Sequence, residues 1–306
     1  MNKRLRIFLN LVLVLVLAVS AVVLVIQQIR WHESAKAQEK AAEAAQFTPP
    51  VQTEAPPLPS RFLAPSEPAQ SEDPGVSEMP PEPTEAPPEP SAPAEPEPEE
   101  TDPVADGLSK VNLAALQSVN PDVVGWIYVP GTNISYPLLQ GVDNSYYLEH
   151  SWEKRWTGGG SIYIDWRCSR ALDGFNTILY GHRMNNGTMF GPLQRYESLD
   201  FWRMYPYVYI VDSTYVHRYA VFAAGEISVT SEIYTTVEGG TPEERQAFLD
   251  LCTDSSQLDT GVLLGPEDKV LTLSTCTYVG GRETRWVVQA VLDQVYEGAV
   301  ADLAGM

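Results

Sequence analysis

An uncharged apolar stretch near the N-terminus restricts this chain more than any other feature. Ile7–Ile29 contains 23 residues and no charged side chain, and as a helix at about 1.5 Å per residue it would be roughly 34 Å long, enough for a bilayer core of about 30 Å. A cleaved signal peptide is the alternative, but its apolar stretch is usually only about 7–15 residues. Three basic residues precede the stretch and only Arg30 follows directly, which favours a cytoplasmic N-terminus. The sequence therefore predicts that residues 1–30 form a cytoplasmic N-terminus and a single-pass anchor, with the rest of the chain outside the membrane.

Proline dominates the next part of the chain. Residues 48–103 hold 18 of the 25 prolines, interleaved with Glu, Ala, Ser and Thr. Such a composition cannot bury enough apolar surface to fold, and as polyproline II at about 3.1 Å per residue it would reach at most roughly 170 Å. We therefore expect residues 31–107 to be a disordered Pro/Glu-rich stalk. It would either hold a domain away from the membrane or be an unselected tether, and the sequence does not separate these two readings.

The charge balance excludes one class of partner. Residues 31–107 carry 17 acidic and 3 basic side chains, and residues 108–306 carry 23 acidic and 13 basic ones. Nucleic-acid binding needs a basic footprint that neutralises phosphates. Neither part supplies one, so no nucleic-acid partner is expected.

Residues 108–306 have the pattern of a mainly β domain. A short amphipathic helix is predicted over 108–119, and further helices around 187–196 and 242–252, the last opened by a capping box of Thr241 and Glu244. Short runs rich in Val, Ile, Tyr and Trp, bounded by turn residues, predict seven or more strands of a barrel or sandwich: 123–129, 161–165, 177–181, 207–211, 215–223, 270–276 and 285–295.

Few residues of this domain are chemically reactive. Its cysteines are 168, 252 and 276, and its histidines are 150, 182 and 217. The sequence lacks Cys-x-x-Cys, His-Glu-x-x-His and Gly-x-Ser-x-Gly, the common dithiol, zinc and serine-hydrolase signatures. A zinc site built from scattered Cys and His remains an open alternative, but no metal or cofactor is predicted.

Cys276 and His182 each end a predicted strand. Alternation along 270–276 puts Thr272, Ser274 and Cys276 on one face and Leu271, Leu273 and Thr275 on the other. Either a strand-end Cys or a strand-end His is, alone, more often a packing residue than a catalytic one. Together they meet the requirement of a cysteine nucleophile for a histidine partner.

The same segments resemble the sortase family of cysteine transpeptidases. Thr272-Leu273-Ser274-Thr275-Cys276 is similar to the family's TLxTC signature, and Arg285 begins a strand nine residues later, as the family's catalytic arginine does. Further matches resemble class B members in particular, and the resemblance covers essentially all of 108–296. These matches are Pro121–Ile127, Pro130–Ile134, Tyr180–Met184 and Gly187–Leu193.

This resemblance implies a fold, a set of catalytic groups and a reaction. The fold would be an eight-stranded sortase-type β-barrel with N-terminal helices and a helix inserted before the Cys276 strand. Cys276 would attack a Thr carbonyl in the C-terminal sorting signal of a secreted protein and form a thioacyl enzyme. His182 would act as general acid and base, Arg285 would stabilise the oxyanion or the substrate, and Ser274 and Thr275 would contact the substrate.

The resemblance also leaves several choices open. The acceptor would be an amine of a cell-wall peptide or peptidoglycan precursor, or alternatively a pilin Lys in a pilus-assembling enzyme. The sorting signal would be NPxTN-like or LPxTG-like. An alternative of another class is a catalytically inactive wall-binding scaffold, which would need a broken catalytic triad.

The remaining cysteines and a second arginine complete the expectations. We expect Cys168 and Cys252 to be packed and reduced, with a disulfide between them as the alternative in an oxidising exterior. Arg282 also follows Cys276 closely, but it lies beside two glycines in the segment between the strands. We therefore predict Arg285 for the oxyanion, and we expect residues 1–107 to contribute nothing to the chemistry.

Overall fold

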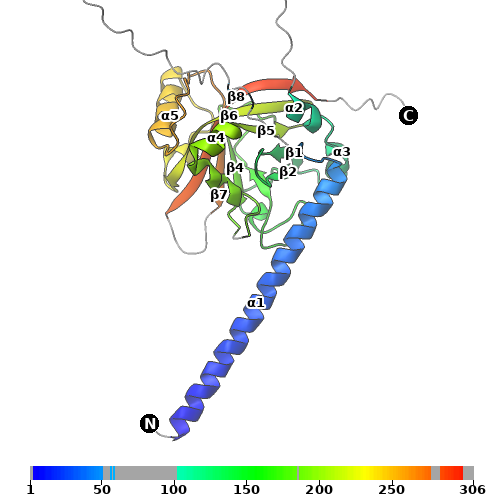
Figure 1. The fold of residues 1–306 in the computed structure, drawn as a ribbon, viewed down its shortest axis with the longest axis vertical. Coiled ribbons are helices and arrows are strands. Elements are labelled where there is room, and N and C mark those ends of the chain that lie inside the picture. Colours follow the sequence, from blue (N-terminus) through cyan, green and yellow to red (C-terminus); the bar gives the residue numbers. More distant parts are fainter. Residues whose placement is uncertain are drawn as a thin grey trace, which may run out of the picture.

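The fold is a closed β-barrel of eight strands, as predicted. The computed structural model describes residues 3–50, 56, 58, 102–184, 186–276 and 283–298. Around the barrel the strands follow the order β1-β2-β3-β4-β7-β8-β6-β5 (Figure 1), and closure leaves no free sheet edge. The strands are β1 Val123–Tyr128, β2 Ser135–Leu139, β3 Ile162–Ile164, β4 Asn176–His182, β5 Tyr207–Val211, β6 Tyr215–Ser228, β7 Val270–Cys276 and β8 Thr284–Glu297.

Short helices surround the barrel. The inserted helix α5 (Pro242–Asp254) precedes the Cys276 strand and opens with the predicted capping box. In Figure 1 it lies on the opposite side of the barrel from α2 and α3. The other helices are α2 Pro103–Leu108, α3 Leu113–Val119 and α4 Leu199–Met204, with 3₁₀ turns η2 Tyr146–Leu148, η3 Gly191–Glu197 and η4 Glu232–Tyr234.

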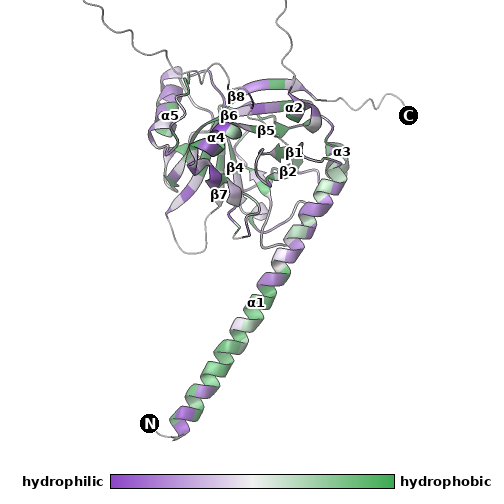
Figure 2. Ribbon diagram, in the orientation of Figure 1, coloured by the Kyte–Doolittle hydropathy of each residue, from purple (hydrophilic) through white to green (hydrophobic). Residues whose placement is uncertain are grey.

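One long helix, α1 (Lys3–Ala45), projects from the domain as a straight rod (Figure 1). After a hydrophilic N-terminal end, the helix is mainly apolar on all sides up to about its middle (Figure 2), and residues 4–29 are exposed along their whole length. By length and composition it is the one helix among the described residues that could cross a membrane. A helix that is apolar on all sides and not covered by protein suits a lipid environment.

The helix continues well beyond residue 30, where the stalk was expected to begin. It ends only at Ala45, and Ala37, Ala41 and Ala45 are buried against the domain. The physical reason is local, since residues 34–45 consist mostly of Ala, Glu, Lys and Gln, all strong helix formers, and contain no proline. Residues 59–101, most of the predicted stalk, lie outside the described residues, so disorder there stays a prediction.

Three other elements differ from the sequence prediction. The strand β2 was not predicted because it contains Pro137, and proline has no N–H to donate to a neighbouring strand. The structure tolerates this proline because β2 pairs with β3 only through Leu138 and Leu139, which follow it. The single helix expected over 108–119 is divided, because Asn112 caps α3 by accepting from the Ala115 amide. The helix expected around 187–196 is the 3₁₀ turn η3, followed by α4.

Asp102 fastens the start of the domain to the barrel. Its carboxylate caps α2 and also accepts hydrogen bonds from the Tyr209 hydroxyl at 2.9 Å and from Arg218 at 3.1 Å. The Arg218 guanidinium is buried and reaches a second carboxylate, Asp293, at 2.7 Å. After the Pro-rich segment, contacts with the barrel therefore resume at Asp102, a few residues before residue 108.

We predict that a chain starting at residue 108 is less stable than one starting at residue 102. Loss of a buried ionic partner typically costs about 3–5 kcal/mol, and because Arg218 keeps Asp293 we expect about 2 kcal/mol here. Thermal unfolding of the two chains measures the difference. In the longer chain Asp102→Ala should reproduce most of the loss, whereas equal melting temperatures of all three proteins would contradict this role of Asp102.

Candidate active site

Two parallel strands bring the predicted nucleophile and its histidine partner together. Strands β4 and β7 pair in register over seven residues, from Asn176 opposite Val270 to His182 opposite Cys276. Neighbouring strands of a sheet lie only about 4.8 Å apart. The backbones of His182 and Cys276 are therefore adjacent at the same end of the barrel; the side chain of Cys276 lies outside the described residues.

His182 is held in one orientation by a carbonyl group. Its Nε2–H donates to the Leu148 carbonyl oxygen at 2.7 Å, and its own carbonyl oxygen accepts from the Phe190 amide at 2.9 Å. A carbonyl can only accept, so Nε2 carries a proton and Nδ1 is the second ring nitrogen available for proton transfer. The 3₁₀ turn η2 that supplies Leu148 is thus a positioning element for the histidine.

Arg285 lies on the other side of β7. Strands β7 and β8 are antiparallel neighbours with Ser274 opposite Val287. Arg285, half-buried at the start of β8, donates from Nη1 to the Thr275 carbonyl oxygen at 3.3 Å. Arg282 lies outside the described residues.

The two predicted substrate-contact residues lie inside the protein. Ser274 is fully buried, and its hydroxyl shares a hydrogen bond of 2.9 Å with the Tyr234 hydroxyl. The Thr275 hydroxyl accepts from the Trp286 amide at 3.1 Å and donates to the Trp286 carbonyl at 3.2 Å. Here both side chains bind their neighbours, and contact with a substrate stays a prediction.

A cavity of about 250 Å³ opens beside these strand ends. Its wall includes Arg285 and also Leu148, whose carbonyl oxygen binds His182. Three tyrosines supply most of the remaining wall, and Tyr180 lies opposite Ser274 in the β4–β7 register. Sequence reasoning missed the lining residues Asn144, Leu148, Tyr163, Tyr180, Val229 and Tyr234.

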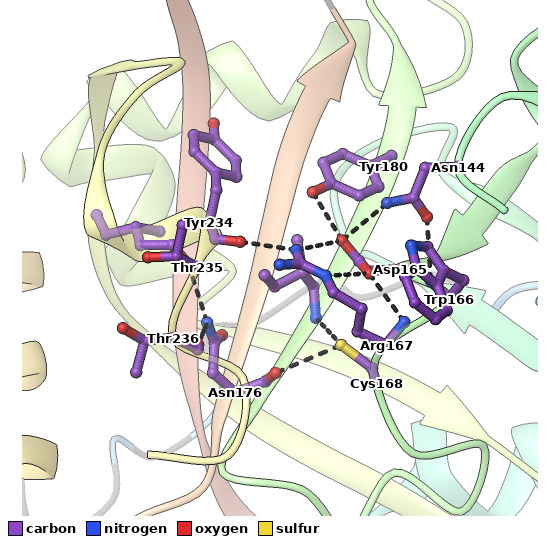
Figure 3. A network of polar contacts seen from close by, with 12 residues as sticks. Asn144, Asp165, Trp166, Arg167, Cys168, Asn176, Tyr180, Tyr234, Thr235 and Thr236 are labelled. Carbon is purple, nitrogen blue, oxygen red and sulfur yellow. Dashed lines mark hydrogen bonds and ion pairs between the residues drawn. The ribbon is translucent and has the colours of Figure 1, made fainter. Parts of the chain in front are cut away.

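One buried carboxylate ties the walls of this cavity together. Asp165 accepts from the Asn144 amide at 2.9 Å, from the Tyr180 hydroxyl at 3.1 Å and from Arg167 at 2.7 Å (Figure 3). Arg167 in turn donates to the Tyr234 carbonyl at 2.7 Å. Three cavity-lining residues therefore depend on one ion pair.

The charge state of Asp165 follows from this network. Burial favours the neutral acid and would raise the pKa of Asp165, but hydrogen bonds from Arg167 and Asn144 outweigh it and hold the pKa below its ordinary value. Asp165 is thus an anion at neutral pH. It forms the centre of the network in Figure 3.

Cys168 and Cys252 are buried free thiols, as predicted. Burial raises the pKa of Cys168 to about 11 and that of Cys252 to about 12, so neither is a thiolate at neutral pH. Among the described residues no group of His, Cys, Asp and Glu is arranged to hold a metal ion.

With the fold and the neighbouring strand ends of His182 and Cys276 described, the chain can be compared with known proteins. A family model described as the sortase domain matches residues 127–293. Sortase B of Listeria monocytogenes is 32% identical over 188 residues, which cover 61% of this chain and 76% of the relative. Sortase B of Staphylococcus aureus is 32% identical over 174 residues, which cover 57% and 71%.

A solved structure agrees with these relatives. The Staphylococcus aureus sortase B–substrate complex matches with a TM-score of 0.56 and 31% identity, covering 59% of this chain and 84% of that one. The chain belongs to the sortase family, resembles its class B members and is a sortase-type cysteine transpeptidase.

We predict that Asp165→Asn destabilises the domain at neutral pH by about 3 kcal/mol, the lower end of the cost of breaking a buried ion pair. A depressed carboxyl pKa contributes stability that is complete above the unfolded value, about 3.9, and is lost as pH falls through the lower folded value. The difference in free energy of unfolding between parent and variant, measured by denaturant titration, should therefore become smaller below pH 4. A difference that stays constant from pH 7 to pH 3 would contradict an ionised Asp165.

Proposed function

We propose that this protein is a membrane-anchored class B sortase that cleaves the C-terminal sorting signal of secreted proteins at Thr. The acyl group would pass to an amine of a cell-wall peptide or peptidoglycan precursor. The observation that carries the proposal is the register that pairs His182 with Cys276 next to the cavity lined by Arg285.

The proposed chemistry has two steps with balanced proton transfer. The Cys276 thiol passes its proton to His182, and the thiolate attacks the Thr carbonyl. As the tetrahedral intermediate collapses, His182 returns that proton to the departing amide nitrogen and a thioester remains. The incoming amine then attacks the thioester, its extra proton passes through His182 to the sulfur, and a new amide and the free thiol result.

The hydrogen bond of His182 suits this double role. With Nε2–H committed to the Leu148 carbonyl, we assign the proton transfers to Nδ1. The carbonyl oxygen would also stabilise the positive imidazolium that forms transiently within each step, as the partner of a catalytic histidine should. Since Leu148 lines the cavity, substrate and histidine would contact the same 3₁₀ turn.

Arg285 is proposed to bind the oxyanion. Continued by two residues, the β7–β8 register of Ser274 opposite Val287 would set Cys276 opposite Arg285. Directly opposed residues have Cβ atoms about 4.5–5.5 Å apart, within reach of a guanidinium that donates to a carbonyl held at the sulfur. Its bond to the Thr275 carbonyl supports an orientation fixed before substrate arrives.

We assign Ser274 and Thr275 to the substrate site as supports of its walls. Ser274 bonds the cavity-lining Tyr234. Thr275 presents its carbonyl to Arg285 and joins β7 to β8. In this way both residues would influence substrate binding without leaving their buried hydrogen bonds.

The N-terminal helix supports an enzyme at the outer face of a cell membrane. The apolar part of α1 is a candidate span, and the excess of basic residues before it favours a cytoplasmic N-terminus. The catalytic domain would then be extracellular, where a cell-wall amine of a Gram-positive bacterium is available. A pilin Lys is the alternative acceptor.

The test combines thiol labelling with a peptide panel. Residues 102–306 are treated with a methanethiosulfonate and, separately, incubated with NPxTN-like and LPxTG-like peptides and an amine acceptor. We expect a single adduct, lost in Cys276→Ala, because the other two thiols are buried and protonated. We also expect cleavage and amine transfer with one class of peptide. A folded domain with an unreactive Cys276 and no cleavage would instead favour an inactive scaffold.

Arg285→Ala should lower kcat/KM by at least about 10²-fold, since removal of one oxyanion donor typically costs 10²–10³. Arg285→Lys should recover only part of the activity, because an ammonium cannot reproduce the guanidinium fork. Arg282→Ala is the matched control and should stay within a few-fold of the parent. An inactive Arg282→Ala beside an active Arg285→Ala, both folded, would show that the proposed register is wrong.

A further inference from the structure

Both ends of the Pro-rich segment are held by the catalytic domain. On the N-terminal side Phe47 is buried with its ring edge-on to Trp126 and Tyr128, at centroid distances of 6.4 and 5.8 Å. The Tyr128 hydroxyl donates to the Pro50 carbonyl at 3.4 Å. On the C-terminal side, Asp102 is buried against Tyr209 and Arg218. The chain therefore reaches the domain before its Pro-rich segment, and again after it.

The last turns of α1 make specific contacts with the domain. The buried positions Ser34, Ala37, Ala41 and Ala45 recur every three or four residues, so they form one face of the helix. The Trp152 indole donates to the Ala37 carbonyl at 2.7 Å, and this bond is buried. At the end of the helix the Asn112 amide donates to the Ala45 carbonyl at 2.9 Å.

A charge pair on the surface extends this interface. Lys40 lies 3.2 Å from Glu153, which follows Trp152. Because α1 is one uninterrupted helix from its apolar part to Ala45, the contacts fix the domain relative to the membrane-spanning part.

The contacts run in a defined order along the helix. Close to the apolar part, Ser34 packs tightly against Gly159: a Cβ atom added to Gly159 would lie 2.3 Å from the Ser34 hydroxyl oxygen. One turn later the Gln38 amide donates to the Met189 sulfur at 3.6 Å. Met189 forms an isolated antiparallel β-bridge with Arg183, the residue after His182. The contacts farther from the membrane are those of Ala45 and Phe47, with Asn112 and Trp126.

The His182 end of the barrel is thus the membrane-proximal end. Ser34 lies five residues after Ile29, the last residue of the apolar run, which is about 8 Å along a helix. The first contacts with the domain therefore come within about the thickness of a headgroup layer.

We propose that the juxtamembrane helix 34–45 is a rigid mount, which holds the catalytic domain at the membrane surface with its His182 end facing the bilayer. The Pro-rich segment then does not space the domain from the membrane, because the domain is attached ahead of it. Shortening this segment or cutting it would leave the height and orientation of the active site unchanged.

The experiment cuts the full-length chain in its native membrane. A specific protease site is inserted after Gly75, and membranes are sedimented after cleavage in physiological salt. We expect the C-terminal fragment, which carries the domain, to stay in the pellet with the N-terminal fragment, because α1 holds it without a covalent link. Release of that fragment from the parent protein, or recovery of the N-terminal fragment itself in the supernatant, would overturn the proposal.

Two helix variants show whether α1 is responsible. Ala41→Glu puts a charge into the buried face and should shift the pellet-to-supernatant ratio of the cleaved domain by at least about tenfold. Ala35→Glu, on the exposed face of the same helix, should behave like the parent. Retention in all three proteins would also count against the mount, since the domain would then bind the membrane by itself.

A cross-linking pair covers the case in which Ala41→Glu impairs folding. Lys40→Cys with Glu153→Cys, joined by a short bifunctional thiol reagent, should restore a full-length band after cleavage. Glu43→Cys on the exposed face, with Glu153→Cys, is the control and should not. Peptide cleavage by the same membranes is scored separately, so a failed mount and a failed enzyme give different results.

Discussion

The parallel pairing of β4 with β7 is the constraint on which the rest of the structure depends. Parallel neighbours cannot be joined by a tight turn, so the chain must leave the end of β4 and return to the start of β7 by a long connection. That connection holds α5 and the strands β5 and β6, and β8 after β7 joins these strands to close the barrel. Because β4 and β7 run in the same direction and in register, both end at one rim. The backbones of His182 and Cys276 are then adjacent at that rim.

Buried polar groups stabilise this pairing at the opposite end of the two strands. Asn176, fully buried at the start of β4, accepts from the Thr272 hydroxyl at 2.7 Å and donates to the Thr236 carbonyl at 2.8 Å. One side chain thus joins β4, β7 and the segment after η4. Unpaired buried amides are costly, so the arrangement resists sliding of one strand along the other. Tyr234, the last residue of η4, lines the cavity and is bonded by both Ser274 and Arg167.

Much of the barrel could be predicted from sequence because it follows local rules, and so could the strand ends at His182 and Cys276. A run of Val, Ile and Tyr bounded by turn residues predicts β5, alternation predicts the faces of β7, and the order Thr272 to Cys276 with Arg285 behind it identifies the family. The cavity could not be predicted, since its lining comes from five separate segments whose meeting depends on barrel closure. Only Asp165 left a usable signal: an acid that ends a hydrophobic strand, two residues before Arg167, suggests a buried ion pair.

The borders of the Pro-rich stretch could not be predicted from composition, for a physical reason. Composition averaged over 31–107 is dominated by proline, which hides the helix-forming stretch 34–45 and the capping residue Asp102 at its two borders. The sequence left two roles open for the segment between the predicted anchor and the domain, a spacer or an unselected tether, and both assume that order along the chain is also order in space. In the structure the anchor helix touches the domain directly, through Ala37 and Trp152. If α1 spans a membrane as proposed, the distance from the membrane to the active site depends on the length of a helix, at about 1.5 Å per residue, and not on the reach of a proline-rich chain.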